Sequence, residues 1–219
     1  MSKQAKPEYK LFVGVLCNQA FVPTPFAQSL SQMALPRGTI VEFVGGRTID
    51  AMRNRICDIA LEGDYTHCCM LDSDMVYQPF TFWELLKADK DIIAGLSVTR
   101  LPPPRPVFMQ PIEEDEWQFL MEWPPGVEGV HECGAIGGAA LMLKRDTLRL
   151  LPRPWFRSDQ VNAKGLPVSE DVYFCTVARK RGLEVHCHTK VRPQHLVEHG
   201  YVPTVKDGHW EVDAVHVAR

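Results

Sequence analysis

The sequence predicts an α/β fold in which a mostly parallel central sheet carries helices on both faces. Three observations lead to this prediction. The first half of the chain alternates short apolar runs with stretches of helical periodicity, which is typical of strand–helix units. One apolar run ends in Asp72-Ser73-Asp74, and open α/β sheets bind ligands where their strands end. The length of 219 residues is enough for one domain with a buried core.

The first half contains the regular alternation. Apolar runs predict strands, and apolar positions recurring every three to four residues predict helices. The predicted strands span residues 11–16, 39–44, 67–71 and 92–98, and the predicted helices span 26–34, 48–62 and 80–87. Gly and Pro separate these elements, as in Pro36-Arg37-Gly38 and Gly45-Gly46.

The second half is less regular. The Pro-rich residues 101–106 exclude a regular helix or an inner strand, so they form a linker or a loop over a cleft. Beyond them the sequence predicts strands at 116–123, 139–144 and 183–188, helices at 146–151 and 169–181, and a loop-like tail from His195.

Composition excludes several classes of protein. The net charge of −3 argues against a nucleic-acid partner, which a basic surface would attract. The seven cysteines form no Cys-x-x-Cys pair, so we expect buried, reduced thiols, a cytoplasmic location and no structural zinc. No apolar run approaches membrane-spanning length and no signal-peptide core is present, so we expect no membrane insertion.

The acidic tripeptide Asp72-Ser73-Asp74 is the strongest functional signal. Carboxylates at the end of a strand suit a hard divalent cation, and such a cation suits a diphosphate. The chain has a second such tripeptide, Asp89-Lys90-Asp91, which precedes a strand and is typical of a solvated turn. A turn, or capping of the following helix, is the structural alternative for Asp72 and Asp74.

A second acidic pair, Glu170-Asp171, follows Ser169. The serine predicts a helix N-cap, and acids in the first turn complement the helix dipole. A carboxylate that faces a cleft can also act as a general base toward a hydroxyl group. The two interpretations are compatible.

Histidine could complete a cation site. His195 follows the last predicted strand, and a mixture of carboxylate and imidazole favours manganese. A surface or capping role is the alternative for His195. His199 is a second candidate, and His186 with His188, on one strand face, is a third.

Arg53 and Arg55 lie in the predicted helix that follows the second strand. Either side chain could reach a phosphate, and a solvated helix face is the alternative.

Three segments in this order resemble a GT-A-fold (Rossmann-like) glycosyltransferase, similar to the family-2-like enzymes of bacteria and phages. The segments are Arg53-Asn54 with the run from Cys69 to Met75, then Gly134 to Lys144, and then Ser169 to Cys175 with His195. The resemblance spans most of the chain. It implies a single domain with a nucleotide-binding half over residues 9–98, an acceptor and catalytic half over 99–199, and a tail over 200–219.

The resemblance also implies roles for the acidic residues and the late histidine. Asp74 would bind Mn²⁺ or Mg²⁺ directly, and His195 would be a further ligand. Asp72 would contact the metal or the ribose. Asp171 would be the base of an inverting reaction, with Glu170 beside it.

The nucleotide and the sugar would lie against other residues. The resemblance places these in two groups: Leu16, Cys17 and Asn18 around base and ribose, and Arg53, Asn54, Ser73, Gly137 and Gly138 around phosphates and sugar. Cys17-Asn18-Gln19 replaces the family's usual Pro-x-Tyr-Asn, and Gly45-Gly46 stands where a base-recognising Asp is usual. The identity of the base is therefore open.

The function implied is metal-dependent transfer of a sugar from a nucleotide-diphosphate sugar to an acceptor hydroxyl, with inversion, or with retention if Asp171 only caps its helix. Family frequency favours a UDP-sugar such as UDP-glucose. Two alternatives remain. One is a haloacid-dehalogenase-like phosphatase with Asp72 as nucleophile and Asp74 as acid/base. The other is a non-enzymatic module that binds sugar nucleotides or glycans.

Overall fold

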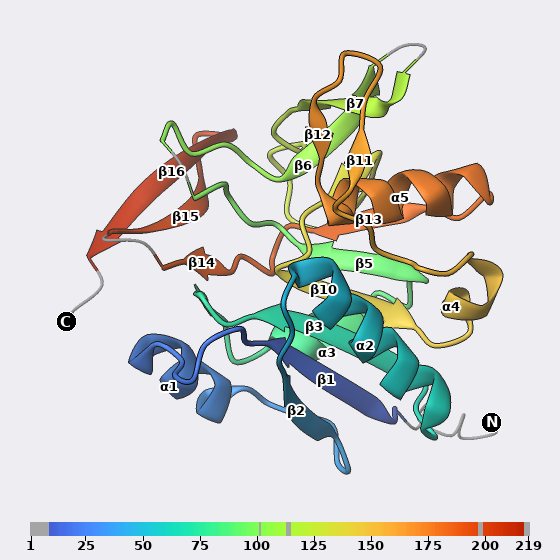
Figure 1. Cartoon of the computed structure of the whole chain (residues 1–219). Coiled ribbons are helices and arrows are strands. Elements are labelled where there is room, and N and C mark those ends of the chain that lie inside the picture. Colours follow the sequence, from blue (N-terminus) through green and yellow to red (C-terminus); the bar gives the residue numbers. More distant parts are fainter. Residues whose placement is uncertain (1–8, 101, 113–114, 197–198, 217–219) are drawn as a thin grey trace, which may run out of the picture.

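The computed structural model describes residues 9–100, 102–112, 115–196 and 199–216, and a seven-stranded sheet runs through its centre (Figure 1). In spatial order the strands are β2 (Ile40–Val44), β1 (Leu11–Leu16), β3 (His67–Asp72), β10 (Ala140–Lys144), β5 (Ile92–Gly95), β13 (Val185–His188) and β8 (Val130–Cys133).

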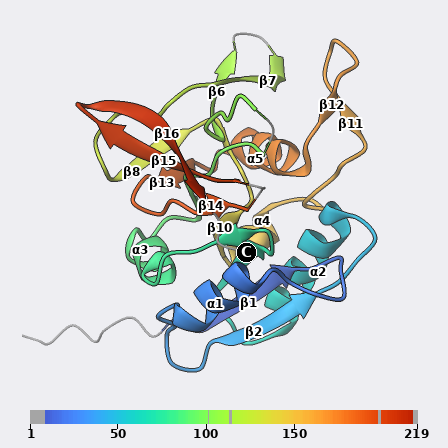
Figure 2. The same ribbon diagram turned by 90° about the vertical axis from the view of Figure 1, so that its left-hand side faces the viewer.

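Helices and three small sheets surround this centre. The helices are α1 (Thr24–Gln32), α2 (Ile49–Glu62), α3 (Thr81–Lys87), α4 (Thr147–Leu150) and α5 (Glu170–Lys180). One small sheet has the order β16 (His209–His216), β15 (His199–Lys206), β14 (Gln194–His195) and β4 (Met75–Val76). Another has the order β7 (Asp115–Met121), β6 (Phe108–Ile112) and β9 (Ala135–Ile136), and β11 (Gln160–Val161) pairs with β12 (Pro167–Val168). Figure 2 shows the β15–β16 and β11–β12 hairpins on different sides of the molecule.

The prediction of a mostly parallel, helix-flanked, Rossmann-like sheet is wrong. β1 runs parallel to β2 and β3, and β5 runs parallel to β13, but β10 lies antiparallel between β3 and β5. β8 is antiparallel to β13, and every pairing described in the small sheets is antiparallel, so the described chain is strand-rich and mostly antiparallel. Strand–helix alternation in the first half identifies the strands. It does not reveal where a strand from the irregular second half inserts.

Successive side chains of β1 enter two separate hydrophobic cores. Phe12 packs in the cluster that contains Ile56 of α2, whereas Val13 packs in the cluster that contains Phe82 of α3. This alternation follows from the two-residue period of a strand, and burial on both faces explains the continuous apolar run. A Cβ atom at Gly14 would lie 2.3 Å from Ile56 Cγ1, so glycine allows α2 to approach β1 closely.

The tail predicted as a loop instead forms paired strands. β14, β15 and β16 follow one another after Arg192, and β15 pairs with β16 along its whole length. The turn between them has positive φ at Asp207 (52°) and Gly208 (79°). Asp-Gly is a strong hairpin signal because a two-residue hairpin turn requires such angles. The dipeptide was therefore the available sequence signal for this hairpin.

None of the helices within the described ranges has both the length and the apolar character needed to cross a lipid bilayer.

The prediction of buried, free cysteines is confirmed for six of the seven, because only Cys17 is partly exposed. Burial raises the pKa of Cys68 and of Cys175 to about 12, which keeps both as unreactive thiols. We expect iodoacetamide to alkylate the native protein at Cys17 alone, as measured by intact-mass spectrometry. A Cys17→Ser variant should stay unmodified until denaturant is added, and modification of that native variant would contradict the packing described.

Candidate functional site

The chain continues from the end of β3 into two-residue strand β4, which pairs with two-residue strand β14. Asp72 closes β3, Ser73 and Asp74 form a turn, and β4 begins at Met75. β4 pairs antiparallel with β14, which sets His195 opposite Met75. The amide of Leu196 donates to the carbonyl of Asp74 over 2.8 Å. Two short strands therefore bring the predicted acid and the predicted histidine together.

His195 lies beside Asp74 with its ring held in one tautomer. Its Nδ1 lies 3.0 Å from the carbonyl oxygen of Val98. Because a carbonyl only accepts, Nδ1 carries the proton and Nε2 is left as the acceptor. Nε2 lies 3.4 Å from Asp74 Oδ2. Burial lowers the pKa of His195, and the neighbouring Arg100 lowers it further, so the ring is neutral near pH 7.

Arg100 completes this group, and the sequence patterns did not single it out. Its guanidinium forms an ion pair with the carboxylate of Asp74. Its Nε lies 3.5 Å from His195 Nε2. The side chain is 58% exposed. Arg100 adjoins the Pro-rich segment, so its position depends on a loop that no periodicity describes.

Arg53 lies beneath Asp72 rather than in solvent. Its three nitrogens donate to Asp72 Oδ1 over 3.1 Å, to Glu170 Oε1 over 3.0 Å and to the carbonyl of Gly138 over 3.0 Å. The side chain is 1% exposed. Burial opposes its charge, but the carboxylates of Asp72, Glu170 and Asp171 outweigh that effect and raise its pKa. Arg53 is therefore a buried cation that orients Asp72. The sequence predicted that it would contact a phosphate, but its nitrogens bond to protein groups away from solvent.

Glu170 and Asp171 open α5 and face the same network. Glu170 is buried against Arg53, and burial followed by the charge of Asp171 raises the pKa of Glu170 while Arg53 opposes the rise. Asp171 accepts from the amide of Gly138 over 3.3 Å and from the hydroxyl of Ser169. It also accepts from the amide of Val172 over 2.8 Å. The carboxylate of Asp171 is thus half-buried and held by several donors.

A cleft of about 1130 Å³ opens at the ends of β1 and β3. It is large enough for a cofactor-sized ligand. Its lining consists of Leu16, Asn18, Gln19, Phe21, Pro23, Ile49, Met52, Asp72, Ser73, Asp74, Arg100, Pro102, His195, Leu196 and Tyr201. Six residues predicted for the site therefore line one cavity: Leu16, Asn18, Asp72, Ser73, Asp74 and His195.

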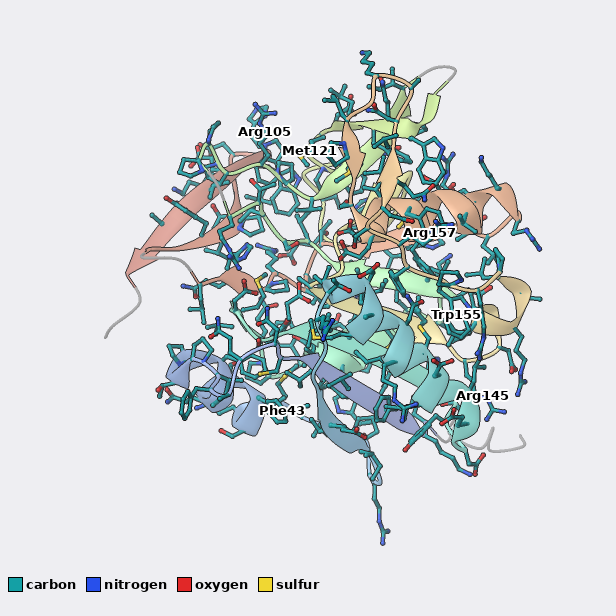
Figure 3. The ribbon with its side chains drawn as sticks, in the orientation of Figure 1. Phe43, Arg105, Met121, Arg145, Trp155 and Arg157 are labelled. Atoms are coloured by element: carbon teal, nitrogen blue, oxygen red, sulfur yellow. The ribbon has the colours of Figure 1, made fainter. Side chains whose placement is uncertain are left out.

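Two other predicted site residues, Asn54 and Cys17, bond to backbone groups of the protein. Asn54 accepts from the amides of Trp155 and Phe156 and donates to the carbonyl of Phe156, so it fixes the loop before β11. Figure 3 shows Trp155 between α2 and α4. The thiol of Cys17 contacts the carbonyl of Gln19.

The two glycines predicted for the site, Gly137 and Gly138, allow close packing. A Cβ atom at Gly138 would lie 2.4 Å from the guanidinium of Arg53, and one at Gly137 would lie 2.8 Å from Val107 Cγ1. The backbone at Gly138 thereby links Arg53, through its carbonyl, to Asp171, through its amide.

The rival histidines lie elsewhere. His186 faces Glu184 at 3.3 Å and His188 faces Glu84 at 3.5 Å, and burial lowers the pKa of both rings. Neither is among the described residues that line the cleft. The side chain of His199 lies outside the described part of the chain. The second tripeptide pairs with Lys144, at 2.9 Å from Asp89 and 3.2 Å from Asp91, as expected for a surface turn.

Tyr77 and Phe21 are two further residues of this region that the sequence patterns did not reveal. The buried hydroxyl of Tyr77 contacts the carbonyls of Asp72 and Ala139, which fixes the end of β3 against β10. Phe21 is 85% exposed and lines the cleft. In the sequence, the only sign of this role is that Phe21 is an aromatic residue three positions after Asn18.

Asp74 and His195 suit a cation whose remaining ligands come from a bound substrate and water. Within the described ranges, no three or more His, Cys, Asp and Glu side chains form a metal-binding group, so Asp72, Asp74 and His195 are not gathered as one trio. Asp74 Oδ2 and His195 Nε2 nevertheless lie 3.4 Å apart, and both can donate a lone pair to a cation. Mg²⁺ and similar ions take few protein ligands and complete their shell with phosphate oxygens and water.

No model of a known protein family matches the sequence, and no curated protein matches it. Among solved structures it is similar to A197 from STIV, with a TM-score of 0.62 and 19% identity over 96% of this chain and 97% of that one. At this identity the likeness shows a shared fold alone.

Proposed function

We propose that this protein is a metal-dependent glycosyltransferase that moves a sugar from a nucleotide-diphosphate sugar, UDP-linked by preference, to an acceptor hydroxyl with inversion. The observation that carries the proposal is the short distance, 3.4 Å, between Asp74 Oδ2 and the unprotonated Nε2 of His195. Both residues line a cleft of about 1130 Å³. A carboxylate and an imidazole lone pair suit Mn²⁺, and the cleft is of a size for a nucleotide.

Asp74 and His195 would hold the cation. When bound there, a divalent ion acts as a Lewis acid and neutralises the charge that develops on a leaving diphosphate. Asp72, whose Oδ1 is fixed by Arg53, keeps its other oxygen for the ribose or for a metal-bound water. The hydrogen bond that Nδ1 of His195 donates to the carbonyl of Val98 holds the ring in the tautomer that a metal ligand requires.

Asp171 would act on the acceptor. As the acceptor oxygen bonds to the anomeric carbon, Asp171 takes the hydroxyl proton, and the electron pair of the sugar–oxygen bond leaves with the diphosphate. The donors from Ser169 and Gly138 orient the carboxylate for this step. Attack from the side opposite the leaving group inverts the anomeric centre.

The rest of the cleft would hold the nucleoside. Asn18 and Gln19 supply amide groups for hydrogen bonds, and the exposed ring of Phe21 offers a face on which a base can stack. We also propose a cytoplasmic location, because the buried cysteines are free thiols.

A thermal-shift screen of nucleotides and nucleotide sugars, with and without MnCl₂, tests the proposal. A nucleotide at a hundred times its dissociation constant should raise Tm by roughly 5–10 °C for a chain of this size, and only when Mn²⁺ is present. The same mixture should release the nucleoside diphosphate slowly through hydrolysis of the preferred sugar donor.

Asp74→Asn should abolish both the shift and the hydrolysis. Asp91→Asn is the matched control, because it alters the second Asp-x-Asp, which pairs with Lys144, and it should behave as the wild type. Binding without turnover in the presence of any acceptor would favour the binding module. A phosphoaspartate trapped at Asp72 would favour the phosphatase.

A further inference from the structure

The gap between Asp74 and His195 is already filled by a positive charge. The guanidinium of Arg100 pairs with the carboxylate of Asp74 and lies 3.5 Å, through Nε, from His195 Nε2. One side chain therefore occupies both of the donor atoms that a divalent cation would use.

Arg100 and a metal ion cannot share these donors. Arginine has no lone pair and keeps its proton at all ordinary pH, so it cannot join a metal's ligand shell. A divalent ion held by Asp74 and His195 would also repel the adjacent guanidinium. Binding of the ion thus requires Arg100 to release Asp74.

The environment of Arg100 permits this release, in contrast to that of Arg53. Arg53 is 1% exposed and bonds two carboxylates and a backbone carbonyl. Arg100 is 58% exposed, and its side-chain partners among the described residues, Asp74 and His195, both belong to the site. Solvent can receive the guanidinium of Arg100 at little cost.

The cleft offers Arg100 a second partner once a nucleotide is bound. Among the described residues that line the cleft, Arg100 is the one Arg or Lys side chain. A guanidinium binds phosphate oxygens with two parallel hydrogen bonds, which makes it the natural ligand for a diphosphate.

We propose that Arg100 is an exchangeable cation of this site: it occupies the Asp74–His195 gap in the free protein and transfers to the diphosphate when a divalent ion takes its place. Arg100 is then a competitor of the metal and a ligand of the nucleotide. The inference rests on the proposed function for the identity of the anion, and on the ion pair alone for the competition with metal.

Arg100→Gln separates the two roles, because they predict effects of opposite sign. Without nucleotide, Mn²⁺ should bind this variant roughly 2–5-fold more tightly than it binds the wild type. The reason is that the ion no longer has to break the exposed ion pair between Arg100 and Asp74. With saturating Mn²⁺, UDP should bind roughly tenfold or more weakly, since a charged hydrogen-bond donor is lost. Titration calorimetry measures both constants, and electron paramagnetic resonance of free Mn²⁺ gives the first independently.

Arg105→Gln is the matched control from the same loop. Arg105 is exposed, and Figure 3 shows it at the outer surface, apart from the end of β3. It should change neither constant. Arg100→Lys supplies a second comparison: it should still compete with Mn²⁺ but bind UDP less well than arginine does, because lysine lacks the planar pair of donors.

The inference is overturned if Arg100→Gln shifts the two constants in the same direction or leaves either one at the wild-type value. Its failure differs from failure of the proposed function. Opposite shifts without sugar transfer from any nucleotide sugar would support the exchange of Arg100 and reject the glycosyltransferase.

Discussion

Replacing Arg53 with methionine is expected to lower the free energy of unfolding by about 3–5 kcal/mol, because the buried carboxylate of Glu170 and the partly buried carboxylate of Asp72 lose the cation that compensates them. Arg53 is 1% exposed and bonds both Asp72 and Glu170. Methionine retains much of the side-chain volume, so the loss reports on charge rather than on a cavity. Urea denaturation followed by circular dichroism measures the change, with the midpoint compared at equal m-value.

Arg55→Met is the control for this substitution. Arg55 is on the same helix, is 56% exposed and lies 3.9 Å from Glu62, so its replacement should change stability by less than about 0.5 kcal/mol. An equal loss in both variants would contradict the role given to Arg53.

The stability difference should also depend on pH. Burial already raises the pKa of Glu170, and without Arg53 that pKa rises further. A carboxyl group whose pKa is higher in the folded state destabilises that state increasingly as pH rises above its unfolded value of about 4.3. The difference in free energy of unfolding between Arg53→Met and the wild type should therefore become smaller as the pH is lowered from 8 toward about 4.3.

Asp171→Asn is expected to lower the rate of sugar transfer by about 10²–10⁴-fold, the usual contribution of a general base. Asparagine has nearly the same shape, and its oxygen can still accept from the amide of Gly138. It cannot take a proton from the acceptor. The dissociation constant of the nucleotide in the presence of Mn²⁺ should stay at the wild-type value, which distinguishes lost chemistry from lost binding.

Asp159→Asn serves as the control for Asp171. Asp159 is exposed and pairs with Arg157 at 2.6 Å, so the variant should transfer sugar at the wild-type rate. Full activity of Asp171→Asn would show that the base lies elsewhere or that the reaction retains configuration. Steady-state kinetics with analysis of the product anomer decide between these outcomes.

Local elements were predictable from the sequence, whereas strand direction was not. β1 begins and ends at the predicted residues, and α2 and β3 lie within one residue of their predicted ends, because each carries its own hydrophobic period. The position of β10 depends on pairing with β3 and β5, which are distant in sequence and carry no mark of direction. An α/β alternation in the first half therefore led to the wrong sheet.

The candidate site likewise contains residues that the sequence predicted and residues that it did not. Asp74 and His195 were predicted from residue type and from their places after strands, and the structure brings them within 3.4 Å. Arg53 and Arg100 were not predicted in their observed roles. An arginine within a helix looks solvated until its partners are known, and the partners of Arg53 lie 19 and 117 residues away. Arg100 belongs to a loop whose path only the folded chain defines.

The pairing of β4 with β14 has a consequence for synthesis on the ribosome. β1, α2 and β3 emerge early and can begin to fold while the rest of the chain is still being made, since folding proceeds from the N-terminus during translation. Asp74 gains its histidine only after β14 has left the exit tunnel. A nascent chain released before His195 would present half of a cation site, so the protein cannot acquire its proposed activity until translation has passed that residue.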